Sequence, residues 1–147
     1  VLLRPGGISR GAIETALHSA GLHCRLRDTN ALLNHGQPVA PGQLKSHYAP
    51  DASVRLNATS QQGDEELIGF GPIPGAGELS LSLSQSGNIK EAAANLFSML
   101  HQANAVTTGT NRCIAIAPIP KDGIGEAIND RLQRAAAPHN ESSGATK

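Results

Sequence analysis

Hydrophobic positions follow a regular rhythm in the second half of the chain. Residues 54–58 alternate apolar and polar side chains, and residues 67–70 form a short apolar run. In residues 79–84 leucine alternates with serine, which predicts a strand with one buried face. Residues 113–117, Cys-Ile-Ala-Ile-Ala, are continuously apolar, a pattern that is typical of a strand buried on both faces.

Two amphipathic helices are predicted between and after these strands. The first begins at Asn88, which with Glu91 three residues later resembles a capping box. Its apolar stripe consists of Ile89, Ala92, Ala93, Leu96, Leu100 and Ala103. The stripe of the second consists of Ile124, Ala127, Ile128, Leu132 and Ala135. The order strand, helix, strand, helix predicts a right-handed βαβ unit in an open α/β sheet.

The first 26 residues follow a different plan. They comprise the end of a strand, a turn at residues 4–7 and a helix over residues 12–20 that Ser9 caps and Gly21 ends. One strand, one turn and one helix cannot enclose a core. We interpret this piece as the last unit of another domain, and we expect apolar surface to be exposed on it.

Residues 27–50 have no sustained period and are rich in Gly, Pro, Asn and Asp, which predicts an extended arm. Lys45, His47 and the only tyrosine, Tyr48, gather near its end. A cation and two polar rings could reach the phosphates or base of a nucleotide, with the arm acting as a lid. The alternative is a linker whose tyrosine packs against a neighbouring domain. Residues 138–147 are polar and aperiodic, so we expect a disordered tail.

Composition narrows the classes of function. Twelve Lys and Arg balance twelve Asp and Glu, so no global charge attracts nucleic acid or an anionic membrane. No apolar run approaches the ~20 residues that span a bilayer. Cys24 and Cys113 match no metal-binding spacing, and we interpret them as free thiols of a cytoplasmic protein. The histidines include no pair at i, i+3 or i+4, so no metal site is expected.

Three further features could carry chemistry. Arg4, at a strand end beside a tight turn, can clamp a phosphate or carboxylate, or it is a solvated arginine. Residues 123–125, Gly-Ile-Gly, open a helix whose first amides could bind an anion. Ile128 stands where the dinucleotide fingerprint needs a third glycine, which favours a structural turn. Asp130 and Arg134 can pair across one helical turn.

Four segments together resemble a known family: residues 3–6 (Leu-Arg-Pro-Gly), 40–50 (Ala-Pro-Gly-Gln-Leu-Lys-Ser-His-Tyr-Ala-Pro), 83–97 and 117–132. In this order they are similar to the C-terminal half of the two-domain L-threonylcarbamoyl-AMP synthases. The specific parts are the Lys-x-His-Tyr-Ala-Pro end of the arm and the final Gly-x-Gly-x-Ala-Ile-x-Asp-Arg-Leu. The arm departs from the family at its start, which reads Ala-Pro-Gly-Gln where Ser-Pro-Gly-Met is common.

The resemblance implies a division of the chain. Residues 1–26 would be a remnant of a YrdC-like catalytic domain, 27–50 the interdomain linker arm, 51–137 an accessory domain and 138–147 a disordered tail. The implied fold class is α/β. It is a small Rossmann-like three-layer domain with an open, mainly parallel sheet, preceded by an extended linker and the terminal helix of a missing catalytic domain.

The resemblance also implies an activity for the whole enzyme. L-threonine, bicarbonate and ATP, with Mg²⁺, would give threonylcarbamoyl-AMP and pyrophosphate, and partner proteins would later transfer the threonylcarbamoyl group to tRNA. This region would be an accessory, gating part, inactive alone and without direct contact to nucleic acid or membrane. Arg4 and Tyr48 would contact the nucleotide, with Lys45 and His47 nearby. No catalytic residue or metal ligand is assigned to the chain.

Two alternatives remain open at this point. The chain could be an independent regulatory module that binds a nucleotide or small ligand at the helix terminus near Gly123. It could instead be a purely structural or dimerisation domain.

Overall fold

The computed structural model describes residues 2–27, 50–74 and 81–137 of the chain. The elements in chain order are α1 (Arg10–Ser19), β1 (Val54–Leu56), β2 (Glu66–Phe70), β3 (Leu81–Ser84), α2 (Ile89–Thr107), β4 (Ile114–Ile116) and α3 (Ile124–Ala135). Each helix that the apolar pattern predicts is present. The predicted tail and the interior of the predicted arm lie outside the described residues.

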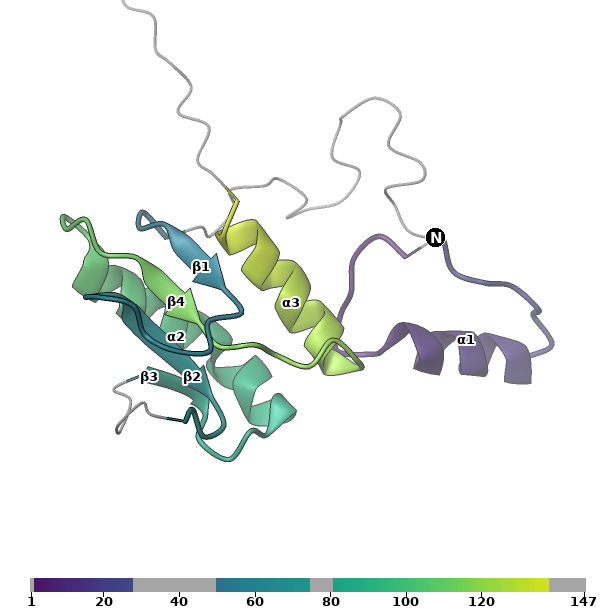
Figure 1. Cartoon of the computed structure of the whole chain (residues 1–147). Helices are drawn as coiled ribbons and strands as arrows, with labels where there is room; N and C mark the ends of the chain where they lie inside the picture. The colour runs from purple at the N-terminus through teal and green to yellow at the C-terminus, as the bar shows by residue number, and fades with distance from the viewer. Residues whose placement is uncertain (1, 28–49, 75–80, 138–147) are drawn as a thin grey trace, which may run out of the picture.

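The four strands form one open sheet in the order β1-β4-β2-β3, and every neighbouring pair is parallel. β4 comes last in the sequence but lies between β1 and β2 (Figure 1). Its three residues, Ile114 to Ile116, are completely buried, as the continuous apolar run predicts. The predicted open, parallel α/β sheet is therefore confirmed.

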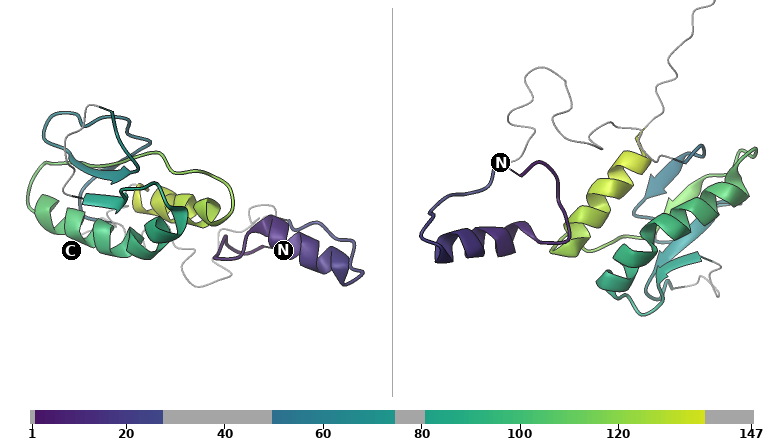
Figure 2. Two further views of the ribbon diagram at one scale, coloured as in Figure 1. Left: turned by 90° about the horizontal axis from the view of Figure 1, so that it is seen from below. Right: turned by 180° about the vertical axis from the view of Figure 1, so that it is seen from behind.

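Both helices of the α/β unit lie on one face of the sheet, where they pack against each other (Figure 2). On this face the side chains of Ile114 and Ile116 join the main core with Ile68. The other buried members of this core come from β3, the two helices and the segment after β4: Leu81, Leu83, Ala92, Leu96, Leu100, Ala103, Ile119, Ile128 and Leu132.

The opposite face of the sheet carries a smaller apolar cluster. Leu67 and Ala115 point to this side, and they contact Ala58 and Ile73 from the segments that follow β1 and β2. In the described part of the chain, the layer on this side thus consists of connecting segments. Successive residues of a strand point to opposite sides of the sheet, and the central strands carry apolar side chains on both sides. Both faces of the sheet must therefore be covered.

The end of β3 differs from the expected alternation of buried leucine and exposed serine. Ser84 is only 1% exposed, and it follows the buried Leu83 directly. The ladder between β2 and β3 is irregular here, because Gly69 pairs with Ser82 whereas Phe70 pairs with Ser84. An extra residue in one strand reverses the direction of the side chains beyond it. The serine therefore turns inward instead of toward solvent.

Ser84 completes the cap of α2. The Asn88 side chain accepts hydrogen bonds from the amides of Lys90 and Glu91, as expected of an N-cap. The Asn88 amide donates to Ser84 Oγ at 2.9 Å, and Ser84 Oγ donates to Glu91 Oε2 at 2.5 Å. A simple capping box would join Glu91 to the Asn88 amide directly. Here the serine hydroxyl stands between them.

The N-terminal segment, residues 2–27, is held by its own backbone. The Leu2 amide donates to the Arg27 carbonyl at 2.8 Å, and Ser9 caps α1 by accepting from the Ala12 amide. No residue of α1 is buried. Ile8 is 68% exposed, which confirms the predicted exposed apolar surface on this segment. Among the described residues, no helix is long and apolar enough to cross a membrane.

Replacement of Gly125 by alanine is expected to destabilise the α/β unit. The added Cβ would lie 2.0 Å from the Pro120 carbonyl oxygen, a backbone atom that cannot rotate away. The first turn of α3 would have to move off this segment, with an expected loss of about 2–4 kcal/mol. Thermal unfolding followed by circular dichroism should show a midpoint lower by about 10 °C or more. Gly11→Ala is the control, because its Cβ meets nothing within 4 Å.

Candidate functional site

Arg4 lies at a contact between the N-terminal segment and α3. Its Nη2 atom donates to Asp130 Oδ2 at 3.3 Å. The two side chains are 27% and 20% exposed, so both are largely withdrawn from solvent. Arg4 therefore contacts a carboxylate and is not simply solvated, and its contact with a phosphate stays a prediction.

Asp130 is shared by two arginines. Arg134 donates to it through both Nε, at 3.1 Å from Oδ2, and Nη2, at 2.9 Å from Oδ1. This i, i+4 pair within α3 confirms the pairing expected from the sequence. We call Arg4, Asp130 and Arg134 the arginine–aspartate triad. Two guanidinium groups around one carboxylate leave the triad with a formal charge of one positive unit.

Asn129 fixes the part of α3 that carries Asp130. Its Nδ2 atom donates to the carbonyls of Ile119 at 3.3 Å, Pro120 at 3.0 Å and Gly125 at 2.8 Å. This role of Asn129 is not predicted by the sequence pattern. The sequence holds no clear signal for it, because an asparagine that donates to backbone carbonyls is indistinguishable in composition from any other polar residue of a helix.

The Gly-Ile-Gly start of α3 has a structural function in this geometry. Gly123 adopts φ 57° and ψ −125°, which glycine tolerates best. The amide of Gly125 donates to the Asp122 carbonyl at 2.9 Å, and that of Glu126 to the Gly123 carbonyl at 3.3 Å. Two amides of the first turn are therefore already paired. This agrees with the structural turn that the sequence favours over an anion site.

The arm residues Lys45, His47 and Tyr48 lie outside the described part of the chain. The structure resumes at Pro50, which is buried, and the Asp51 amide donates to Asn104 Oδ1 at 2.9 Å. Asn104 therefore attaches the end of the arm to α2. The sequence gives little warning of this function, because one asparagine on a polar helix face is unremarkable except for its weak helix propensity.

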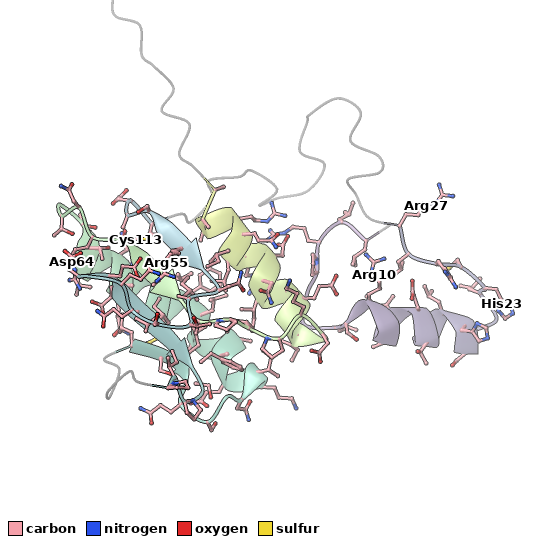
Figure 3. The ribbon with its side chains drawn as sticks, viewed as in Figure 1. Arg10, His23, Arg27, Arg55, Asp64 and Cys113 are labelled. Carbon is pink, nitrogen blue, oxygen red and sulfur yellow. The ribbon has the colours of Figure 1, made fainter. Side chains whose placement is uncertain are left out.

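A second group of charges lies at the amino end of the sheet, far from Arg10 and Arg27 (Figure 3). Arg55 donates to Glu65 through Nε at 2.8 Å and Nη2 at 2.5 Å. This hydrogen bonding by Arg55 lowers the pKa of Glu65, and the same contact raises the pKa of Arg55. Arg112 pairs with Glu66 at 2.9 Å. These pairs join connecting segments to strands.

Two histidines five residues apart in the sequence lie together. The Nδ1 atoms of His18 and His23 are 3.1 Å apart, because the chain reverses at Gly21 with φ 78°. Within the described ranges there is no group of three or more His, Cys, Asp or Glu residues that could hold a metal ion. Cys24 and Cys113 are free thiols, as expected.

Comparison with known proteins gives consistent matches. The family model described as "Threonylcarbamoyl-AMP synthase, C-terminal domain" matches residues 8–137. The threonylcarbamoyl-AMP synthase of Bacillus subtilis (strain 168) is 28% identical over 151 residues, which cover 92% of this chain and 41% of that protein. The crystal structure of P. abyssi Sua5 complexed with L-threonine has a TM-score of 0.63 at 24% identity, with 92% of this chain and 42% of that chain covered. The chain thus spans about two fifths of the length of these relatives.

Glu65 should make stability depend on acid pH. Its folded-state pKa is lowered below the ordinary value of 4.5, so its contribution is present above that value and is lost as the pH falls through the folded-state pKa. The free energy of unfolding should therefore decline more steeply below pH 4.5 in the wild type than in Glu65→Gln. Urea denaturation at a series of pH values measures this difference. Equal slopes for the two proteins would contradict the assignment.

Proposed function

Because the chain belongs to the family of threonylcarbamoyl-AMP synthase C-terminal domains, we propose that it is the accessory region of an enzyme that forms threonylcarbamoyl-AMP. The enzyme would consume L-threonine, bicarbonate and ATP and release pyrophosphate, in the cytoplasm, as a step toward threonylcarbamoyladenosine in tRNA. The match of residues 8–137 to the family model carries this proposal. The L-threonine bound to P. abyssi Sua5 supports threonine as the amino-acid substrate.

The catalytic machinery is assigned to a YrdC-like domain joined to this region. Mg²⁺ would enter as the substrate complex MgATP. This region would supply contacts at the margin of the nucleotide. Arg4 is proposed to contact phosphate, and Tyr48 of the arm to contact the nucleotide, with Lys45 and His47 nearby.

Gating is proposed to depend on the two ends of the arm. One end follows Arg27, whose carbonyl is bonded to the Leu2 amide. The other end is followed by Asp51, whose amide donates to Asn104 of α2. The arm therefore connects the segment that carries Arg4 with the α/β unit. A change in the contact between these two parts would be transmitted directly to the arm.

Removal of the arm and the accessory domain tests the proposal. In the intact enzyme, truncation before Ala40 should abolish pyrophosphate release from ATP that requires threonine and bicarbonate. The remaining catalytic domain must stay folded, which its circular dichroism and unfolding midpoint check. Unchanged turnover would instead identify this region as a structural, dimerisation or separate ligand-binding module.

Arg4→Ala tests the proposed phosphate contact. Loss of a charge-assisted hydrogen bond of about 1.5–3 kcal/mol should raise the KM for ATP by about 10- to 100-fold, with a much smaller effect on the KM for threonine. Arg112→Ala is the matched control, since Arg112 also pairs with a carboxylate but lies beside β4 at the amino end of the sheet. A KM for ATP that is equal in both variants would argue against a specific role for Arg4.

A further inference from the structure

The two arginines of the arginine–aspartate triad hold Asp130 unequally. Arg134 contacts both carboxylate oxygens and lies one helical turn away in α3. Arg4 comes from 126 residues away in the sequence and contacts Asp130 through Nη2, at 3.3 Å from Oδ2. Bidentate guanidinium–carboxylate geometry is the stronger arrangement. Arg4 is therefore the partner that is released more easily.

Release of Arg4 would not leave the Asp130 carboxylate unpaired. Asp130 is only 20% exposed, and a largely buried carboxylate that loses its sole cation is strongly disfavoured. Arg134 remains in contact with both oxygens after Arg4 leaves. A phosphate group offers Arg4 more negative charge and more acceptor oxygens than a carboxylate does. Exchange of Asp130 for phosphate thus gives Arg4 a stronger acceptor and leaves Asp130 paired with Arg134.

The helix would stay in place during such an exchange. Asn129, the residue before Asp130, bonds three carbonyls of the loop and first turn that adjoin it. Gly125 packs its backbone against Pro120 in the same region. Asp130 consequently cannot follow Arg4 without breaking these contacts, so the separation would occur between the N-terminal segment and α3.

We propose that Asp130 competes with nucleotide phosphate for Arg4 and thereby sets the affinity of the enzyme for ATP. Without nucleotide, Asp130 holds Arg4 against α3. With nucleotide, Arg4 transfers to a phosphate oxygen, and Arg134 keeps Asp130 paired. Asp130 and Arg134 are positioning residues that act through Arg4. The inference rests on the proposed function, in which Arg4 contacts ATP.

Substitutions at the two positions should act in opposite directions. In the intact enzyme, Asp130→Asn removes the competing charge and should lower the KM for ATP by about two- to five-fold, the factor that such a charge pair is typically worth. Arg134→Gln leaves Asp130 dependent on Arg4 and should raise the KM by a similar factor. Arg134→Lys restores the charge and should recover most of the wild-type value. The kcat should be unchanged in all three, because the exchange precedes chemistry.

Two further variants separate competition from a general change in charge. Arg131→Gln removes a positive charge next to Asp130, as Arg134→Gln does. Arg131, however, lies over the Phe97 ring, at 5.3 Å from its centroid, and not on the Asp130 carboxylate. The KM for ATP should therefore stay at the wild-type value. The double variant Asp130→Asn/Arg134→Gln has no carboxylate to compete and should behave like Asp130→Asn alone. A general field effect would instead make the two changes cancel.

Each outcome decides between the two proposals. An unchanged or raised KM for ATP in Asp130→Asn, or cancellation in the double variant, overturns the competition while leaving the synthase function intact. A wild-type enzyme without threonine-dependent pyrophosphate release overturns the proposed function, and the inference with it. Unfolding midpoints verify that each variant is folded. If Asp130→Asn is unstable, Arg134→Gln and Arg134→Lys still test the predicted rise and its recovery.

Discussion

The α/β unit depends on β4, a strand of only three residues. Its three residues hydrogen-bond to β1 on one side and β2 on the other, so two parts of the sheet are joined through them. Ile114 and Ile116 fill the core beneath the helices, and Ala115 fills the narrower space on the other face. β4 also delivers the chain to Ala117–Pro120, against which Asn129 and Gly125 place α3. Burial of this one strand therefore sets the sheet order, the helical layer and the position of Asp130.

Much of the fold could be predicted because the spacing of apolar residues along the chain matches the helices and strands that form. The apolar stripes located α2 and α3, and the unbroken apolar run identified β4 as doubly buried. The order of the strands was not predictable, since it depends on pairings between segments far apart in sequence. Ser84 turned inward because of an irregular ladder with β2, which no alternation within β3 reveals. Periodicity reports the environment of an element and says little about its neighbours.

The site shows the same limit. The sequence singled out Arg4 and the Asp130–Arg134 pair separately, and only the folded chain brings them together across 126 residues. Asn104 and Asn129 were missed because each bonds to backbone atoms, and such contacts leave no compositional trace. Lys45, His47 and Tyr48 remain predictions, because they lie outside the described residues. Resemblance to a family therefore contributed the nucleotide-binding hypothesis, and geometry contributed the contacts around Arg4.

The α/β unit and its contact with the N-terminal segment depend on interactions of different physical character. The α/β unit rests on an apolar core, which dissolved salt affects little. The contact of Arg4 with Asp130 joins two charges that lie 3.3 Å apart and are 27% and 20% exposed, and salt screens such a close, partly buried pair much less than it screens exposed charges separated by more than a Debye length. Raised ionic strength would therefore loosen the hold of the N-terminal segment on α3 only modestly, and the apolar core of the α/β unit would respond little.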